Sequence, residues 1–120
     1  VWILFQQGTA TIQSPEQLQG VRRISELLHQ LDDTAHLSGA TVILEITGQT
    51  DVVGRSSRNQ RLSEDRARSV LDALHPATFS AITFHARGIG PAPESAPSQG
   101  AATLPQDRRV SFQATVHPAS

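Results

Sequence analysis

Three polar side chains near the middle of the sequence, Asp51, Asn59 and Arg66, have the chemistry to hold a small charged ligand. A carboxylate such as that of Asp51 accepts hydrogen bonds from an ammonium group, and the guanidinium of Arg66 can hold a carboxylate through two parallel N–H···O bonds. The amide of Asn59 carries a donor and an acceptor and can orient a ligand. These residue types fit the zwitterionic end group of an amino acid, with ammonium and carboxylate on one carbon.

The sequence predicts that these side chains lie where a strand gives way to a helix. Residues 41–47 alternate apolar side chains and indicate a strand, and residues 48–58 are rich in turn formers. Residues 59–74 have helical periodicity, which Pro76 ends. Ligands tend to bind beyond the carboxyl ends of strands that helices connect, and Asp51 occupies such a position.

A helical wheel distinguishes among the arginines of this second helix. Arg61 and Arg68 fall on the side opposite the apolar stripe, whereas Arg66 falls at its edge with Asn59 on the same flank. Arg66 and Asn59 are therefore the side chains best placed to turn toward Asp51. The stripe expected to face the core consists of Ala67, Val70, Leu71 and Leu74.

The remaining periodicities predict the other elements of a single domain over residues 1–120. Ser14-Pro15-Glu16 is typical of a helix start, and Gly39 is expected to close the connection that follows it. The order β-α-β-α-β-β predicts an α/β (α+β) sandwich, with helices packed on one face of a mixed sheet. The expected elements are a strand over residues 1–12, a helix whose apolar positions run from 21 to 35, strands over 81–87 and 110–116, and a long Pro-, Ala- and Ser-rich loop over 88–107.

Composition narrows the possible functions. The net charge is −1, and all ten basic residues are Arg, which gives no electrostatic reason to expect nucleic acid. No Cys is present, and the five His residues lack metal-binding spacing, so we expect neither a metal nor a cofactor. The opening Val1-Trp2-Ile3-Leu4-Phe5 is typical of the middle of a strand, which suggests a fragment of a longer protein.

One motif is specific enough to indicate a family. It reads Thr50-Asp51-x-x-Gly54-x-x-x-x-Asn59-x-x-Leu62-Ser63-x-x-Arg66-Ala67, and it resembles in full the signature of the OmpA-like family, which includes MotB and the peptidoglycan-associated lipoproteins. Further similarities follow the chain: Phe5-x-x-Gly8-x-Ala10, Gly88-x-Gly90 and Asp107-Arg108-Arg109-Val110. The chain departs from the family at position 49, where Gln stands in place of the common His.

The resemblance implies a non-enzymatic domain that binds peptidoglycan noncovalently, through the meso-diaminopimelate of the stem peptide. It also implies a place in the periplasm, within a parent protein that is membrane-associated through other segments. By motif position, Asp51 and Arg66 become the paired ligand residues. Thr50 and Asn59 belong to the same motif, and Val53 lies in the loop that lines the pocket. One of Arg108 and Arg109 is implied to approach the ligand as well.

Other interpretations remain open from the sequence. Asp51 can simply cap the turn after its strand, and Arg66 can form a surface ion pair with Asp51 or Glu64. Arg108 and Arg109 can be a solvated strand entrance. At the level of function, the alternatives are a structural or protein–protein interaction module that uses another face of the fold, and a wall hydrolase. The hydrolase needs a metal or an activated nucleophile, and the sequence contains neither pattern.

Overall fold

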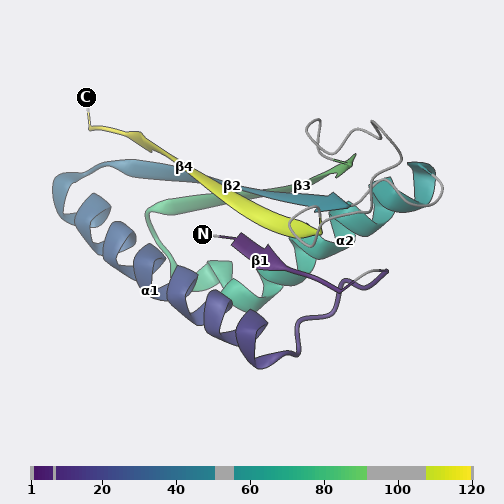
Figure 1. Cartoon of the computed structure of the whole chain (residues 1–120). Helices are drawn as coiled ribbons and strands as arrows, with labels where there is room; N and C mark the ends of the chain where they lie inside the picture. The colour runs from purple at the N-terminus through teal and green to yellow at the C-terminus, as the bar shows by residue number, and fades with distance from the viewer. Residues whose placement is uncertain (1, 7, 51–55, 92–107, 120) are drawn as a thin grey trace.

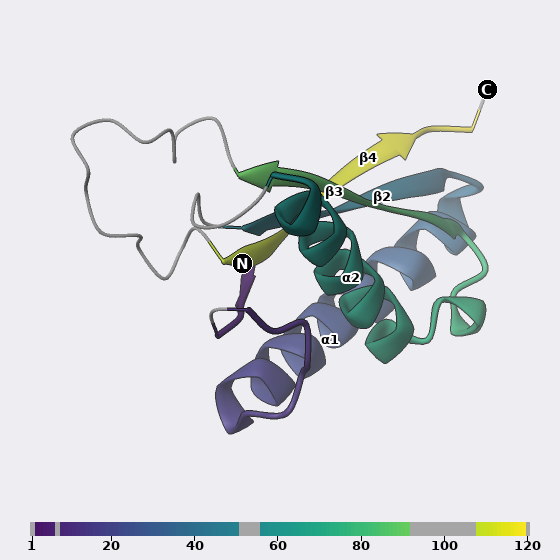
Figure 2. The same ribbon diagram turned by 90° about the vertical axis from the view of Figure 1, so that its right-hand side faces the viewer.

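The computed structural model describes residues 2–6, 8–50, 56–91 and 108–119. Within them, two helices cover one face of a four-stranded mixed sheet, so the predicted fold class and element order are confirmed (Figures 1 and 2). No helix of this part is long and apolar enough to cross a membrane. In chain order the elements are β1 (Trp2–Leu4), α1 (Pro15–Ser38), β2 (Thr41–Thr50), α2 (Ser56–Leu74), the short 3-10 helix η1 (Pro76–Thr78), β3 (Ile82–Pro91) and β4 (Arg109–His117).

The sheet brings the end of β2 next to the start of β4 and the end of β1. The strand order is β1-β4-β2-β3, with β2 parallel to β3 and with β4 antiparallel to both β1 and β2. Val110 of β4 pairs with Gly48 on one side and with Ile3 on the other. On the far side of β2, Thr50 pairs with Pro91 at the end of β3. The ends of β1, β2 and β3 and the start of β4 therefore meet at one edge of the sheet, the edge formed by the carboxyl end of β2.

Helix α1 begins and ends where the sequence predicted. The Ser14 side chain accepts a hydrogen bond from the Gln17 backbone N–H, and the Gln17 side chain accepts one from the Ser14 N–H, which completes a capping box. Gly39 ends the helix in the left-handed conformation, with φ of 75°. Gln17 Nε2 also donates to the Leu4 carbonyl over 2.9 Å, which fixes the start of α1 against β1.

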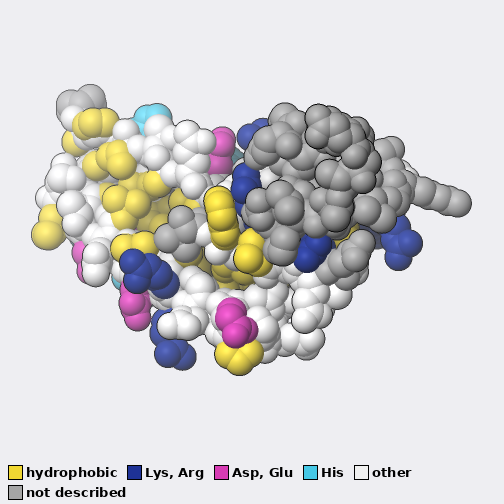
Figure 3. All heavy atoms as spheres, viewed as in Figure 1, with side chains coloured by type: hydrophobic (Ala, Val, Ile, Leu, Met, Phe, Trp, Pro, Cys, Tyr) yellow, Lys and Arg dark blue, Asp and Glu magenta, His cyan; other side chains and the backbone are white. Residues whose placement is uncertain are grey.

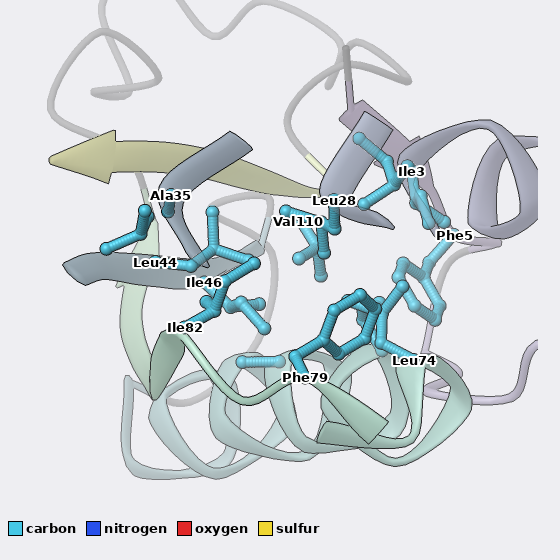
Figure 4. Packing of buried hydrophobic residues seen from close by; sticks show 14 residues of the cluster. Ile3, Phe5, Leu28, Ala35, Leu44, Ile46, Leu74, Phe79, Ile82 and Val110 are labelled. Atoms are coloured by element: carbon cyan, nitrogen blue, oxygen red, sulfur yellow. The ribbon is translucent and has the colours of Figure 1, made fainter. Parts of the chain in front are cut away.

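The core lies between the sheet and the two helices (Figure 4). The alternating apolar side chains of β2 point into it, and α2 contributes three of the four stripe residues as fully buried, with Leu71 only partly buried. Each large aliphatic side chain buried in this way stabilises the fold by about 1.5–3 kcal/mol. The residues at the centre of the core are Val42, Leu44, Ile46, Ala67, Val70, Leu74, Ile24, Leu28, Phe79 and Val110.

The prediction of one strand over residues 1–12 is wrong after residue 4. The chain turns after Phe5: the Thr9 N–H donates to the Gln6 carbonyl over 3.1 Å, and Gly8 has a φ of 75°. Such a turn leaves the carbonyls of Gln6 and Thr9 without ladder partners, because they no longer face a neighbouring strand. Side chains of α2 satisfy these carbonyls instead.

Strands β2 and β3 extend further, and α2 begins earlier, than the sequence indicated. Residues 48–50 and 88–91, expected in a turn and a loop, lie in strands, and the helix expected from residue 59 begins at Ser56. Residues 92–107 of the expected loop lie outside the described residues. The reason for the longer strands is packing: a Cβ on Gly48 would collide with the Ser63 carbonyl oxygen, and one on Gly88 with the Glu64 backbone nitrogen. These glycines let α2 rest directly on the sheet.

We expect Gly88→Ala to lower the free energy of unfolding by about 1–3 kcal/mol, because the added methyl group overpacks the contact with α2. Gly20→Ala is the matched control. A Cβ there would meet only Ile3 Cγ1 at 3.5 Å, and Ala is favoured over Gly within a helix by about 1 kcal/mol. Urea unfolding of both variants measures the effect, and equal stabilities would contradict the close contact between α2 and β3.

Candidate ligand-binding site

The buried guanidinium of Arg66 is the central feature of the predicted site. Arg66 is 1% exposed, and three of its N–H groups donate to backbone carbonyls. Nε donates to Thr9 over 2.7 Å, Nη1 to Gln49 over 3.0 Å and Nη2 to Gln6 over 3.1 Å. Its Cζ also lies 5.4 Å from the centroid of the Phe5 ring. Arg66 therefore joins α2 to the end of β2 and to the segment that follows β1.

Arg66 is buried, so it does not lie at the surface as the alternative interpretation of a surface ion pair assumed. The helical wheel placed Arg66 at the edge of the buried stripe, but the segment after β1 folds over that flank of α2 and covers it. Ser69, one turn further along the helix, holds the same segment, because its Oγ donates to the Ala10 carbonyl over 2.7 Å. The two side chains together clamp residues 8–10 onto α2.

A guanidinium held in this way carries its positive charge into a region of low polarity. The three carbonyl oxygens accept hydrogen bonds from the guanidinium, and its positive charge attracts anionic groups. The charge lies at the carboxyl end of β2, because its partner Gln49 is the penultimate residue of that strand. This is the edge of the sheet where the sequence placed the ligand.

Thr50 and Asn59, two other predicted site residues, are also buried beside this edge, at 1% and 5% exposure. Thr50 Oγ1 and Gln49 Oε1 have no hydrogen-bond partner within the described ranges. Most buried polar atoms are paired, so these two neighbouring exceptions are candidate partners for a polar ligand. The sequence missed Gln49 as a site residue, although its position between strand and motif was the available signal.

Ser63 of the motif has a structural part in the site. It is fully buried, and its Oγ donates to the Gln60 carbonyl over 2.7 Å and accepts from the Gly90 N–H over 3.0 Å. Gln60 Nε2 donates in turn to the Gly88 carbonyl over 2.6 Å. These bonds fix the first turns of α2, which carry Asn59, against the end of β3.

Arg108 and Arg109 lie at the start of β4 but are held by different neighbours. Arg108 Nε donates to the Phe5 carbonyl over 3.1 Å, whereas Arg109 Cζ lies 4.6 Å from the centroid of the Trp2 ring. Both are half-buried rather than fully solvated. They are one strand away from the end of β2, since the next residue, Val110, pairs with Gly48.

Asp51 and Val53 lie outside the described residues. Their flanking neighbours are Thr50, the last residue of β2, and Ser56, the first residue of α2. The role of Asp51 as the ammonium partner therefore stays a prediction. The described part of the predicted site consists of Thr50, Asn59 and Arg66 around the end of β2, with the two arginines of β4 one strand away.

The sequence as a whole matches the model of the OmpA family over residues 4–103. The chain belongs to the OmpA family. It is 39% identical over 82 residues to outer membrane protein A of Serratia odorifera, covering 68% of this chain and 32% of that protein. It is 38% identical over 98 residues to outer membrane protein A of Klebsiella aerogenes, covering 82% of this chain and 25% of that protein. The chain thus spans a third or less of these curated relatives.

Solved structures show the same fold at lower sequence identity. The peptidoglycan-associated lipoprotein of Burkholderia pseudomallei superposes with a TM-score of 0.69 at 20% identity, covering 95% of this chain and 89% of that one. The C-terminal domain of Helicobacter pylori MotB superposes with a TM-score of 0.69 at 16% identity, covering 96% of this chain and 84% of that one. These similarities confirm the OmpA-like arrangement of helices and strands.

We expect Arg66→Ala to lower the free energy of unfolding by about 3 kcal/mol or more, because three charge-assisted hydrogen bonds are lost and buried carbonyls are left unpaired. Arg68→Ala, an exposed arginine two residues along the same helix, should change it by less than about 0.5 kcal/mol. Denaturant unfolding compares the two variants. Similar small losses in both would show that the bonds of Arg66 contribute little to stability.

Proposed function

We propose that this chain binds peptidoglycan noncovalently, through the meso-diaminopimelate of the stem peptide, and so anchors a larger envelope protein to the cell wall. In this proposal Asp51 accepts hydrogen bonds from the ammonium group, and Arg66 attracts and holds the carboxylate of the same end group. Thr50, Val53 and Asn59 line the pocket and orient the peptide. One of the two arginines at the start of β4 completes it.

The buried charge of Arg66 is the observation that carries the proposal. The guanidinium of Arg66 is buried near a hydroxyl and an amide oxygen that have no hydrogen-bond partner in the described part of the chain. A zwitterionic end group can complement these groups: its carboxylate is attracted by the guanidinium, and its ammonium can donate to Gln49 Oε1 or Thr50 Oγ1. A neutral sugar or an apolar peptide supplies only part of this.

The burial of Arg66 defines how a carboxylate reaches it. One route to direct contact is for a ligand oxygen to replace one of the three carbonyl partners. The Gln6 carbonyl, at 3.1 Å from Nη2, forms the longest of these bonds and belongs to the turn before Gly8. In the proposed complex the carboxylate takes this place. A carboxylate accepts a stronger hydrogen bond than a neutral carbonyl, so the exchange is favourable for the buried charge.

Family membership supports the polymer as the ligand. The B. pseudomallei protein of the same fold is named for its association with peptidoglycan, and the two sequence relatives described above are each named outer membrane protein A. We propose by extension that residues 1–120 form one domain of a membrane-associated protein, with the domain in the periplasm. One end group offers few contacts, so each copy binds weakly, and many copies on one cell wall provide firm attachment.

Calorimetric titration with meso-diaminopimelate tests this function, and Asp51→Asn is the decisive variant. It should weaken binding about 10- to 100-fold, which corresponds to the loss of one charge-assisted hydrogen bond of about 1.5–3 kcal/mol. Asp65→Asn, which neutralises an exposed carboxylate on α2, is the matched control and should bind as the parent does. Arg66 is unsuited to this test, because its loss destabilises the fold.

A folded parent that binds neither free meso-diaminopimelate nor whole peptidoglycan sacculi would overturn the proposed function. Equal affinity of the parent and the folded Asp51→Asn variant would instead remove Asp51 from the site. Circular dichroism of each variant establishes that its fold is retained before any loss of binding is interpreted.

Thr50→Val separates the binding role of the buried hydroxyl from a structural one. The variant keeps the shape of the side chain and removes a polar atom that has no partner within the described ranges. The free energy of unfolding should therefore stay the same or rise by up to about 1 kcal/mol, while meso-diaminopimelate binding weakens. Thermal unfolding and calorimetry measure the two effects. A destabilised variant with parental affinity would contradict the assignment.

A further inference from the structure

An open cleft of about 330 Å³ runs between β1 and the start of α1, and Arg66 is not among its lining residues. Its walls combine apolar and polar side chains from three parts of the chain. Figure 3 shows hydrophobic side chains at the surface over β1, on the same face of the molecule as charged side chains. The residues that matter for its chemistry are Trp2, Leu4, Ser14, Glu16, Gln17 and Arg108.

Trp2 is the most unusual feature of this cleft. It is the sole tryptophan of the sequence, and 49% of it is exposed, although a large aromatic side chain gains most from burial. Arg109 lies against its ring, with Cζ 4.6 Å from the centroid, which restricts the orientation of the indole. Leu4, on the same face of β1, is 40% exposed. An exposed indole ring of restricted orientation, beside a second exposed apolar side chain, is typical of a binding surface.

The polar side chains of the cleft are of the kinds that bind hydroxyl groups. Glu16 is exposed on the first turn of α1, and Arg108 is held by its hydrogen bond to the Phe5 carbonyl. A carboxylate accepts from sugar hydroxyls, and a guanidinium donates to them. A sugar ring has an apolar C–H face and a rim of hydroxyls. The indole of Trp2 matches the face, and Glu16 and Arg108 match the rim.

The edge of β1 is a poor site for an added peptide strand. The strand has only three residues, and hydrogen-bonded and non-bonded positions alternate along an antiparallel pair. The Phe5 N–H donates to Arg108 of β4, so the backbone groups of Leu4 face away from β4. The Leu4 carbonyl already accepts from Gln17 Nε2. Few ladder positions remain for a peptide, and the cleft therefore favours a saccharide.

The position of the cleft fits one polymer that reaches both sites. Ile3 of β1 and Gly48 of β2 flank Val110 on either side, so β1 lies two strand spacings, or about 10 Å, from the end of β2. We propose that the cleft beside Trp2 binds amino-sugar rings of the peptidoglycan glycan strand. The identity of this polymer rests on the proposed function, but Trp2, Leu4 and Glu16 of the cleft have no part in the end-group site, and Arg108 is the one candidate that the two sites share.

The fluorescence of Trp2 tests this proposal directly, because no other tryptophan contributes to the signal. The probe is the peptide-free disaccharide of N-acetylglucosamine and N-acetylmuramic acid. The comparison ligand is a sugar-free stem tetrapeptide that contains meso-diaminopimelate. The disaccharide should change the emission of Trp2 saturably. Trp2→Ala should weaken disaccharide binding, measured by calorimetry, by about tenfold, as expected for the loss of one stacking contact.

Three variants separate a binding role from a structural one. Glu16→Ala removes an exposed side chain that the fold does not need and should also weaken disaccharide binding. Leu37→Ala, at an 88% exposed position near the end of α1, is the matched control and should bind both ligands as the parent does. Trp2→Ala should leave binding of the stem tetrapeptide unchanged.

The outcomes distinguish this proposal from the proposed function. A tetrapeptide that binds while the disaccharide leaves Trp2 emission and calorimetric heat unchanged at millimolar concentration would overturn the saccharide site alone. Disaccharide binding that survives both Trp2→Ala and Glu16→Ala would also overturn it, because the sugar would then bind elsewhere. Disaccharide binding without tetrapeptide binding would support the saccharide site and count against the end-group site.

Discussion

The hydrogen bonds of the Arg66 guanidinium are the interaction on which the rest of this edge depends. They join α2 to Gln49 at the end of β2 and to Gln6 and Thr9, which are 60 and 57 residues away in the sequence. Without a donor at this point, the carbonyls of Gln6 and Thr9 would each lose a charge-assisted hydrogen bond. The same group places a positive charge at the edge of the sheet. Stability and charge placement therefore depend on one side chain, and a substitution of Arg66 affects both.

Two glycines in the sheet set the distance between α2, which carries Arg66, and the strands beneath it. Gly48 and Gly88 on adjacent strands let the backbone of α2 at Ser63 approach almost to contact, and Ser63 then bonds the end of β3. A helix held further away would carry Arg66 out of reach of Gln49. Close packing at the two glycines and the reach of one long side chain are therefore parts of a single geometric requirement.

Local patterns in the sequence predicted most of the fold. The capping residues Ser14 and Gly39, the apolar stripe of α2 and the order of elements all follow from interactions within a few residues. The ends of β1 and β2 did not, because they depend on contacts between distant segments: the turn at Gly8 covers α2, and Gly48 meets Ser63. The same reason explains the candidate site. The motif singled out Thr50, Asn59 and Arg66, which lie around the end of β2. The helical wheel underestimated the burial of Arg66, because a helical wheel contains no information about what folds over the helix.

The two proposed sites divide recognition of one polymer according to chemistry. A buried charge with fixed hydrogen-bond partners responds strongly to the charge of its ligand, so the end-group site selects which peptide is bound. An exposed indole with a few polar neighbours tolerates rotation and sliding of a sugar ring, so the cleft beside Trp2 adds affinity with little selectivity. Both are connected through β4, whose first residues contact β1 on one side and β2 on the other. If both sites bind, the loss of one weak contact leaves the second to hold the polymer until the first forms again.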